Sequence, residues 1–160
     1  MIIEKIEVLY GPNQWSDTRQ KLIQMRLNLE ELEQHPTNTI DGFLERLQSL
    51  IPTLYTHRCS PGVPGGFFER VKEGTWMGHV IEHIALEIQT LAGFDTGFGR
   101  TRETETLGTY NVVFSFIDEA VGIYAANASV DIADTLIKGN TYPLKEHITK
   151  MQLIGQPISQ

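Results

Sequence analysis

Residues 74–93 read GTWMGHVIEHIALEIQTLAG and decide the fold, because they predict a helix that is apolar nearly all round. A helix of this kind has to be buried against other elements of a globular protein. Gly93 stands where a glycine commonly follows the last turn of a helix. We therefore expect a central helix over 75–92. Its apolar side chains are Trp76, Met77, Val80, Ile81, Ile84, Ala85, Leu86, Ile88 and Leu91.

Three polar residues interrupt this helix in the pattern H-x-x-E-H: His79, Glu82 and His83. Helical residues four apart lie on one face, with Cβ atoms about 5–6 Å apart, so the two histidines can point at one metal ion. Glu82 lies about 100° round from His83, where a carboxylate can reach a water beside the ion. Two imidazoles, a third protein ligand, a water and a nearby carboxylate form the usual set of a hydrolytic zinc site. The pattern is the inverted form of the zinc peptidase helix.

The alternative interpretation is a core helix that merely carries three polar residues. Buried polar groups without partners cost about 1–3 kcal/mol each, so these side chains require either partners or an ion. Gly78 directly precedes His79 and leaves backbone room for a ligand or a neighbouring segment of chain.

A zinc site needs a third protein ligand, and the spacing offers three choices. Glu119 comes first, because it opens a helix that follows a predicted strand and could pack against 75–92. Glu87 is four residues after His83 but about 12 Å along the helix axis from His79, which suits a partner of a ligand better than a ligand. Cys59 is the third choice, since thiolate binds zinc, although a single cysteine can also be a small buried apolar residue.

The rest of the chain predicts an α+β fold, a mostly antiparallel sheet with helices packed on one face. Alternating or β-branched residues indicate the strands, and apolar stripes with capping residues such as Asn38 or Thr39 indicate the helices. The segment 30–33 is compatible with a short helix, and 94–108 with a polar, glycine-bearing loop. The predicted strands are 2–10, 21–29, 53–59 and 109–117, and the predicted helices are 40–51, 67–73, 118–139 and 144–152, the last within a weakly specified tail over 140–160.

Length and composition limit the class of protein. The chain has 160 residues, which fits a single domain over 1–160. A net charge of −7 argues against a nucleic-acid-binding protein, which normally has a basic face. No apolar run approaches the ~20 residues that span a bilayer, so we expect no membrane partner. The single cysteine and the lack of a signal peptide favour a reducing, cytoplasmic location.

Two arginines lie in the polar segment that follows the central helix. Arg100 and Arg102 are candidates for binding substrate carboxylates, because a guanidinium group offers two parallel N–H donors. The alternative is that they form surface ion pairs with acidic residues such as Glu69, Glu103 or Glu105. His57 has no partner in the sequence pattern and is expected to be an ordinary surface or loop residue.

Three blocks of the sequence together resemble a known family. They are GPNQWSDTRQKLIQMRLNLEEL (11–32), CSPGVPGGFFERVKEGTWMGHVIEHIALEIQTLAG (59–93) and GFGRTRETE (97–105). They are similar to the N-terminal domain of cyanophycin synthetases, and the resemblance runs from about residue 5 to 138. It implies a bacterial cytoplasmic enzyme that uses ATP to build a poly-aspartate chain with arginine on each side-chain carboxylate. ATP and Mg would act in two further domains, an ATP-grasp ligase and a Mur-ligase-like domain, which do not fit in this length.

For this first domain, the resemblance implies a module that holds the growing polymer and, in some members, a metallopeptidase-like site that cuts it into short primers. The family's H-x-x-E-H positions fall on His79, Glu82 and His83. The main hypothesis is therefore a zinc-dependent cyanophycin hydrolase, with Glu82 as the catalytic carboxylate and Glu119 inferred from spacing as the third ligand. In the alternative, the domain only tethers polymer and the helix is structural or vestigial. A third possibility is a structural domain that contacts the other synthetase domains or forms a homo-oligomer.

Overall fold

Helices cover a four-stranded antiparallel sheet in the computed structural model, which describes residues 1–59 and 61–155. The strands are β1 (Ile2–Tyr10), β2 (Lys21–Asn28), β3 (Gly99–Glu103) and β4 (Thr109–Ser115), in the spatial order β1-β2-β4-β3. The α-helices of the described residues are α1 (Phe43–Leu50), α2 (Gly66–Glu73), α3 (Met77–Leu91), α4 (Glu119–Ile137) and α5 (Leu144–Ile154). Three short 3-10 helices are η1 (Glu30–Gln34), η2 (Thr37–Thr39) and η3 (Pro52–Thr56). The predicted α+β fold is confirmed.

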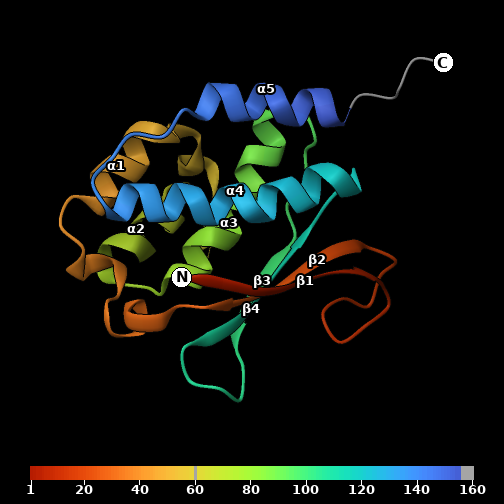
Figure 1. The fold of residues 1–160 in the computed structure, drawn as a ribbon, viewed down its shortest axis with the longest axis horizontal. Coiled ribbons are helices and arrows are strands. Elements are labelled where there is room, and N and C mark those ends of the chain that lie inside the picture. The colour runs from red at the N-terminus through yellow and green to blue at the C-terminus, as the bar shows by residue number, and fades with distance from the viewer. Residues whose placement is uncertain (60, 156–160) are drawn as a thin grey trace.

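The layers follow from which faces are apolar. Helices α3 and α4 pack on the sheet and on each other, and α5 lies against the side of α4 that faces away from the sheet (Figure 1). In β2 the side chains of Ile23, Met25 and Leu27 point into the core and are fully buried. The alternation of apolar and polar residues predicted for 21–29 therefore explains why one face of β2 packs on the core.

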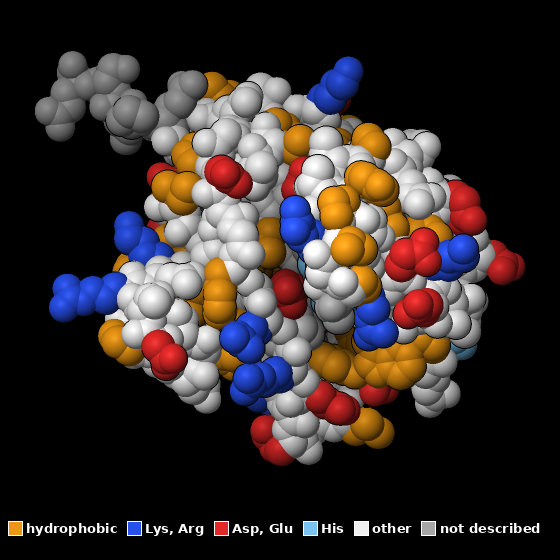
Figure 2. All heavy atoms as spheres, turned by 180° about the vertical axis from the view of Figure 1, so that it is seen from behind, with side chains coloured by type: hydrophobic (Ala, Val, Ile, Leu, Met, Phe, Trp, Pro, Cys, Tyr) orange, Lys and Arg blue, Asp and Glu red, His pale blue; other side chains and the backbone are white. Residues whose placement is uncertain are grey.

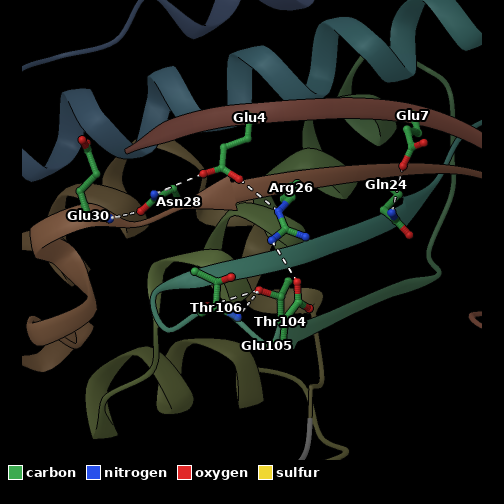
Figure 3. A network of polar contacts seen from close by, with 9 residues as sticks. All are labelled: Glu4, Glu7, Gln24, Arg26, Asn28, Glu30, Thr104, Glu105 and Thr106. Atoms are coloured by element: carbon green, nitrogen blue, oxygen red, sulfur yellow. Dashed lines mark hydrogen bonds and ion pairs between the residues drawn. The ribbon is translucent and has the colours of Figure 1, made fainter.

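The outer face of the sheet carries a polar network (Figure 3) beside a small buried apolar cluster of Trp15, Leu22 and Val113. Arg26 Nε donates to Glu4 Oε2 over 3.1 Å, and Arg26 also reaches Glu105 in the β3–β4 connection at 3.4 Å. Asn28 donates to the second oxygen of Glu4. Exposed pairs of this kind each contribute little to the free energy of folding. The main effect of the network is to present polar side chains to solvent on the side of the sheet that no helix covers.

The central helix α3 is almost wholly buried, as its apolar circumference predicts. A Cβ atom at Gly78 would lie 3.3 Å from Thr101 Cγ2 and 3.5 Å from Tyr110 Cβ. The missing side chain therefore admits a neighbouring segment, the β3–β4 hairpin, to the start of α3. This close approach places β3 beside the polar residues of the helix.

Several predicted boundaries need correction. The strand predicted over 53–59 is wrong, because Pro52 opens η3, and the fixed φ of proline suits the first position of a helical turn. The loop predicted over 94–108 contains the edge strand β3. Helix α1 starts at Phe43 with Gly42 at its N-cap, so neither Asn38 nor Thr39 caps it. The helix predicted over 144–152 is present and extends to Ile154, while 156–160 of the predicted tail lie outside the described residues.

No helix in the described part of the chain combines the length and the apolar character required to cross a membrane.

Candidate metal centre

A cleft of about 990 Å³ opens along one side of α3. The segment 56–59, which follows η3, forms one wall, and the segment 95–102 with β3 forms the other. Figure 2 shows the back of the molecule, where Lys or Arg side chains flank a recessed acidic side chain in a furrow. The cleft is lined by all three residues of the H-x-x-E-H pattern: His79, Glu82 and His83.

Two histidines and a cysteine bring their ligand atoms together in this cleft. His83 Nε2 lies 3.1 Å from His79 Nε2, which lies 3.2 Å from Cys59 Sγ. One ligand atom from each of the three lies within 4.8 Å of the other two. A tetrahedral zinc with Zn–N of about 2.0–2.1 Å and Zn–S of about 2.3 Å would separate its ligand atoms by roughly 3.3–3.6 Å. The spacing and the donor types of this trio therefore fit zinc.

Both histidines are held in the form that binds metal. Burial, with a smaller effect from the Arg70 charge, lowers the pKa of His79 from 6.5 to about 4. Burial, followed by the neighbouring His79 and His57, lowers the pKa of His83 well below 6.5. Neutral imidazole is the metal-binding form, so no proton has to be displaced from a cation at neutral pH. His79 Nδ1 is also within 3.0 Å of the Thr75 hydroxyl.

Glu82 occupies the β3 side of the cleft. Thr101 Oγ1 donates to its Oε2 over 2.6 Å. Burial raises the pKa of Glu82 from 4.5 to about 7, against the opposing effects of the Thr101 hydrogen bond and of His57 and Arg100. A Cβ atom at Gly99 would lie only 2.5 Å from Glu82 Oε1, so a larger residue there would displace the carboxyl group. A carboxyl group with this pKa can both accept and donate a proton near neutral pH.

His57 is a site residue that the sequence interpretation missed. Its Nδ1 lies 2.8 Å from His83 Nδ1, and its Nε2 lies 2.6 Å from Glu87 Oε2. His57 lies in a loop, as one of the two predicted options, but the expectation that it has no partner was wrong, because η3 turns the chain so that His57 contacts α3. No spacing rule links residues 26 positions apart, and the closeness of His57 to Cys59 in the sequence was the one available signal. Glu87 was predicted as the partner of a ligand, and it contacts His57, which in turn contacts His83.

The structure does not bring Glu119 to the cleft. Glu119 lies in the first turn of α4, where its Oε2 accepts a hydrogen bond from the Tyr10 hydroxyl at the end of β1. It is absent from the residues that line the described cleft. Cys59, the third choice from the sequence, takes the place beside the two histidines.

Arginines line both walls of the cleft. Arg100 and Arg102 lie on β3, with their guanidinium carbons 5.5 Å from the Phe98 ring and 5.4 Å from the Trp15 ring. Among the described residues neither forms an ion pair with Glu69, Glu103 or Glu105. Two further arginines line the cleft, namely Arg58 and Arg70. The lining of the cleft thus includes four arginines, of which the two on β3 alternate with Thr101, the residue that bonds Glu82.

The comparisons with known proteins identify the family of this chain. A family model described as cyanophycin synthase-like N-terminal domain matches residues 24–138. This chain belongs to that family. It is 55% identical over 146 residues to a cyanophycin synthetase of Crocosphaera subtropica, and 53% identical to those of Synechocystis sp. and Geminocystis herdmanii. Each alignment covers 91% of this chain and 17% of the relative.

The match to this family confirms the resemblance drawn from the three sequence blocks. The matched region includes the whole H-x-x-E-H helix, Cys59 and both arginines of β3. Because the chain spans only 17% of the length of these relatives, their names describe proteins with a much longer chain.

Proposed function

We propose that this chain is a zinc-dependent hydrolase that cuts cyanophycin into short primers for polymerisation. One observation carries the proposal: His79, His83 and Cys59 bring three zinc-type ligand atoms together in the same cleft as the buried carboxyl group of Glu82. Structural zinc sites usually have four protein ligands, whereas catalytic sites have three and keep one position open. The trio in an open cleft supports the second class.

Each residue has a distinct role in this proposal. Zinc, when bound by His79, His83 and Cys59, would polarise the scissile carbonyl group and make water a stronger acid. Glu82 takes a proton from the attacking water as the new C–O bond forms. It then gives that proton to the amine nitrogen as the C–N bond breaks, so the carboxylate is regenerated. The pKa of about 7 suits both transfers.

The cleft suits a polymer with both charges. Arg100 and Arg102 supply two donors each for the carboxylates of cyanophycin. The guanidinium groups of the polymer would find a carboxylate at the same cleft, where the exposed Asp95 contributes to the lining. The overall charge of −7 adds attraction for arginine-rich material.

The ligase chemistry belongs to other parts of the proposed parent enzyme. Building the polymer requires ATP and Mg, which we assign to domains outside this chain. We infer that residues 1–160 act as a first domain that supplies primers to those domains. The cytoplasmic location predicted from the sequence stays a prediction.

The test is incubation of the chain with cyanophycin, with and without zinc chelator, alongside Glu82→Gln. Without chelator, we expect soluble fragments from the unmodified chain and from the control Glu31→Gln, which changes an exposed glutamate on η1. We expect none from Glu82→Gln and none from any chain with chelator. Fragments that appear equally with chelator or with Glu82→Gln would refute the hydrolase proposal.

The second candidate is a non-catalytic tethering module, and the arginines that line the cleft support it. The same experiment separates the two functions. A tethering module would retain polymer on the immobilised chain at moderate ionic strength while releasing no fragments. A hydrolase would release them in a chelator-sensitive manner.

A further inference from the structure

A series of hydrogen-bonding groups extends from the Nδ1 atom of His83, while its Nε2 atom faces His79. His83 Nδ1 is 2.8 Å from His57 Nδ1, and His57 Nε2 is 2.6 Å from Glu87 Oε2. Glu87 is buried, with 5% of its surface exposed, and it also accepts a hydrogen bond from Thr53. These three residues come from α3 and from the segment that follows η3, so the contact depends on the tertiary fold.

The donor and the acceptor of each hydrogen bond can be assigned by starting from Glu87. Burial acts to raise the pKa of Glu87, but the hydrogen bonds from His57 and Thr53 outweigh it, and the pKa is lowered. An ionised carboxylate has no proton and can only accept. The proton of the short contact to His57 therefore lies on His57 Nε2.

The remaining protons follow from the chemistry of imidazole. A neutral imidazole has one N–H group and one acceptor nitrogen. With its proton on Nε2, neutral His57 presents Nδ1 to His83 as an acceptor, so His83 must donate from its own Nδ1. His83 Nε2 is then left with a lone pair, and this is the atom that faces His79.

We propose that His57 and Glu87 are positioning residues that keep the proton of His83 on Nδ1, so that the Nε2 lone pair points at the metal site. The inference rests on the proposed function, because it assumes that the trio of His79, His83 and Cys59 binds a metal. Metal-binding histidines commonly donate their second N–H to a fixed acceptor, which orients the ring and raises its basicity. Here the fixed acceptor is Nδ1 of His57, which is free to accept because the proton of His57 is held on Nε2 by the buried carboxylate of Glu87.

Ring packing alone does not select which nitrogen of His83 carries the proton. The ring of His83 stacks on Phe67, with centroids 4.2 Å apart and planes 24° from parallel. This contact fixes the plane of the imidazole, but it has no preference between the two N–H forms. His79 provides a contrast, because its partner Thr75 has a hydroxyl group that donates to one form and accepts from the other.

The first test measures the tautomer directly. Nitrogen-15 NMR of the metal-free chain at about pH 8, above the usual range for imidazole titration, separates the two N–H forms of each ring. We expect His83 to have its proton on Nδ1, and Glu87→Gln to give a mixture, because a Gln side chain can either accept from His57 or donate to it. A proton on His83 Nε2 in the unmodified chain would overturn the inference.

The second test measures zinc affinity by competition with a chromophoric chelator. We expect His57→Ala and Glu87→Gln to lose about 10–100-fold in affinity, the usual effect of removing such a partner. His57→Asn places an amide oxygen near the former Nδ1 and should recover part of the loss. His147→Ala is the matched control, since His147 contacts Tyr124 and Tyr142 and does not line the cleft.

The two proposals can fail separately. Tight zinc binding that is unchanged in His57→Ala and Glu87→Gln would overturn the role of these residues and leave the hydrolase proposal standing. If zinc binds and depends on His57 and Glu87 but no fragments form, the hydrolase proposal fails and the positioning role stands. If the unmodified chain binds no zinc, both proposals fail. Glu87→Gln and His57→Asn each introduce a side chain close in size to the original, which limits loss of folding.

Discussion

Glu82 lies on the helix that forms the core and, in the proposed hydrolase, also exchanges a proton. Only 7% of its surface is exposed. In the metal-free protein, burial disfavours its charged form and accounts for the raised pKa. The carboxyl group is therefore a source of pH-dependent stability as well as a candidate base.

The stability of the metal-free chain should depend on pH through Glu82. Between its unfolded pKa of 4.5 and its folded value of about 7, the folded protein holds a proton that the unfolded chain releases. Stability from this group is thus present below pH 4.5 and is lost as the pH rises through about 7. The loss is up to about 3 kcal/mol for a shift of this size.

Denaturant titrations with chelator present can check this with Glu82→Gln. We expect the variant and the unmodified chain to be similar at about pH 4.5 and the variant to be more stable at about pH 8. His79 and His83 act in the opposite sense, but both chains retain them, so their effect cancels in the difference. A difference that is constant across this pH range would show that Glu82 keeps its usual pKa.

At the residue scale, the sequence predicted that His79, Glu82 and His83 lie together, because helical geometry places residues three and four apart on neighbouring positions. It ranked Cys59 below Glu119, because the position of a side chain on a loop depends on tertiary packing. The same reason explains why the sequence did not predict the contacts of His57 with α3. Short-range spacing carries information within a helix, and it carries none between η3 and α3.

The element that shapes the Glu82 environment is β3. Its residues are mostly polar, which is usual for an edge strand and prevents edge-to-edge association. Arg100, Thr101 and Arg102 lack the alternating apolar pattern of β2, so no strand signal was present in this segment. Helix α3 and strands β1, β2 and β4 were predictable, because their apolar patterns match the faces that they bury.

Gly99→Ala should disturb the site through this element. The new Cβ atom would lie 2.5 Å from Glu82 Oε1 and 2.8 Å from its Cγ, so the carboxyl group must move. We expect at least a roughly tenfold loss of cyanophycin hydrolysis and a destabilisation of about 1–3 kcal/mol, typical of overpacking.

The matched control is Gly97→Ala, two residues earlier, where a Cβ atom has no neighbour within 4 Å. Fragment release and thermal denaturation of both variants provide the measurement. Equal activity in the two variants would mean that Glu82 tolerates displacement and is not positioned by β3.

At the scale of the whole molecule, metal binding should stabilise the fold, because the ligands come from different parts of the chain. Ligand that binds only the folded state adds about 2.7 kcal/mol at a concentration about 100 times its Kd. Zinc should therefore raise the Tm of the unmodified chain by several degrees. The double substitution His79→Ala, His83→Ala should abolish this rise, and a rise that persists would place the zinc elsewhere.

The affinity proposed for the polymer should also depend on the charges distributed over the whole molecule. Substituting Arg100 and Arg102 together by alanine should weaken retention of cyanophycin by about tenfold and reduce its dependence on salt. Arg19→Ala changes an exposed arginine that does not line the cleft and serves as the control. Binding isotherms at two ionic strengths would contradict the assignment if both variants lost affinity equally.

The central position of α3 has a consequence for how such a site can diverge. The helix that carries His79, Glu82 and His83 is also the helix around which the core is packed, so most changes along it alter both chemistry and folding. The walls at 56–59 and 95–102 also contain exposed residues that neither form the core nor contact the metal centre, such as Arg58, Asp95 and Arg102. We therefore expect substitutions at these exposed wall positions to change the ligand preference of the cleft with less effect on folding than substitutions along α3.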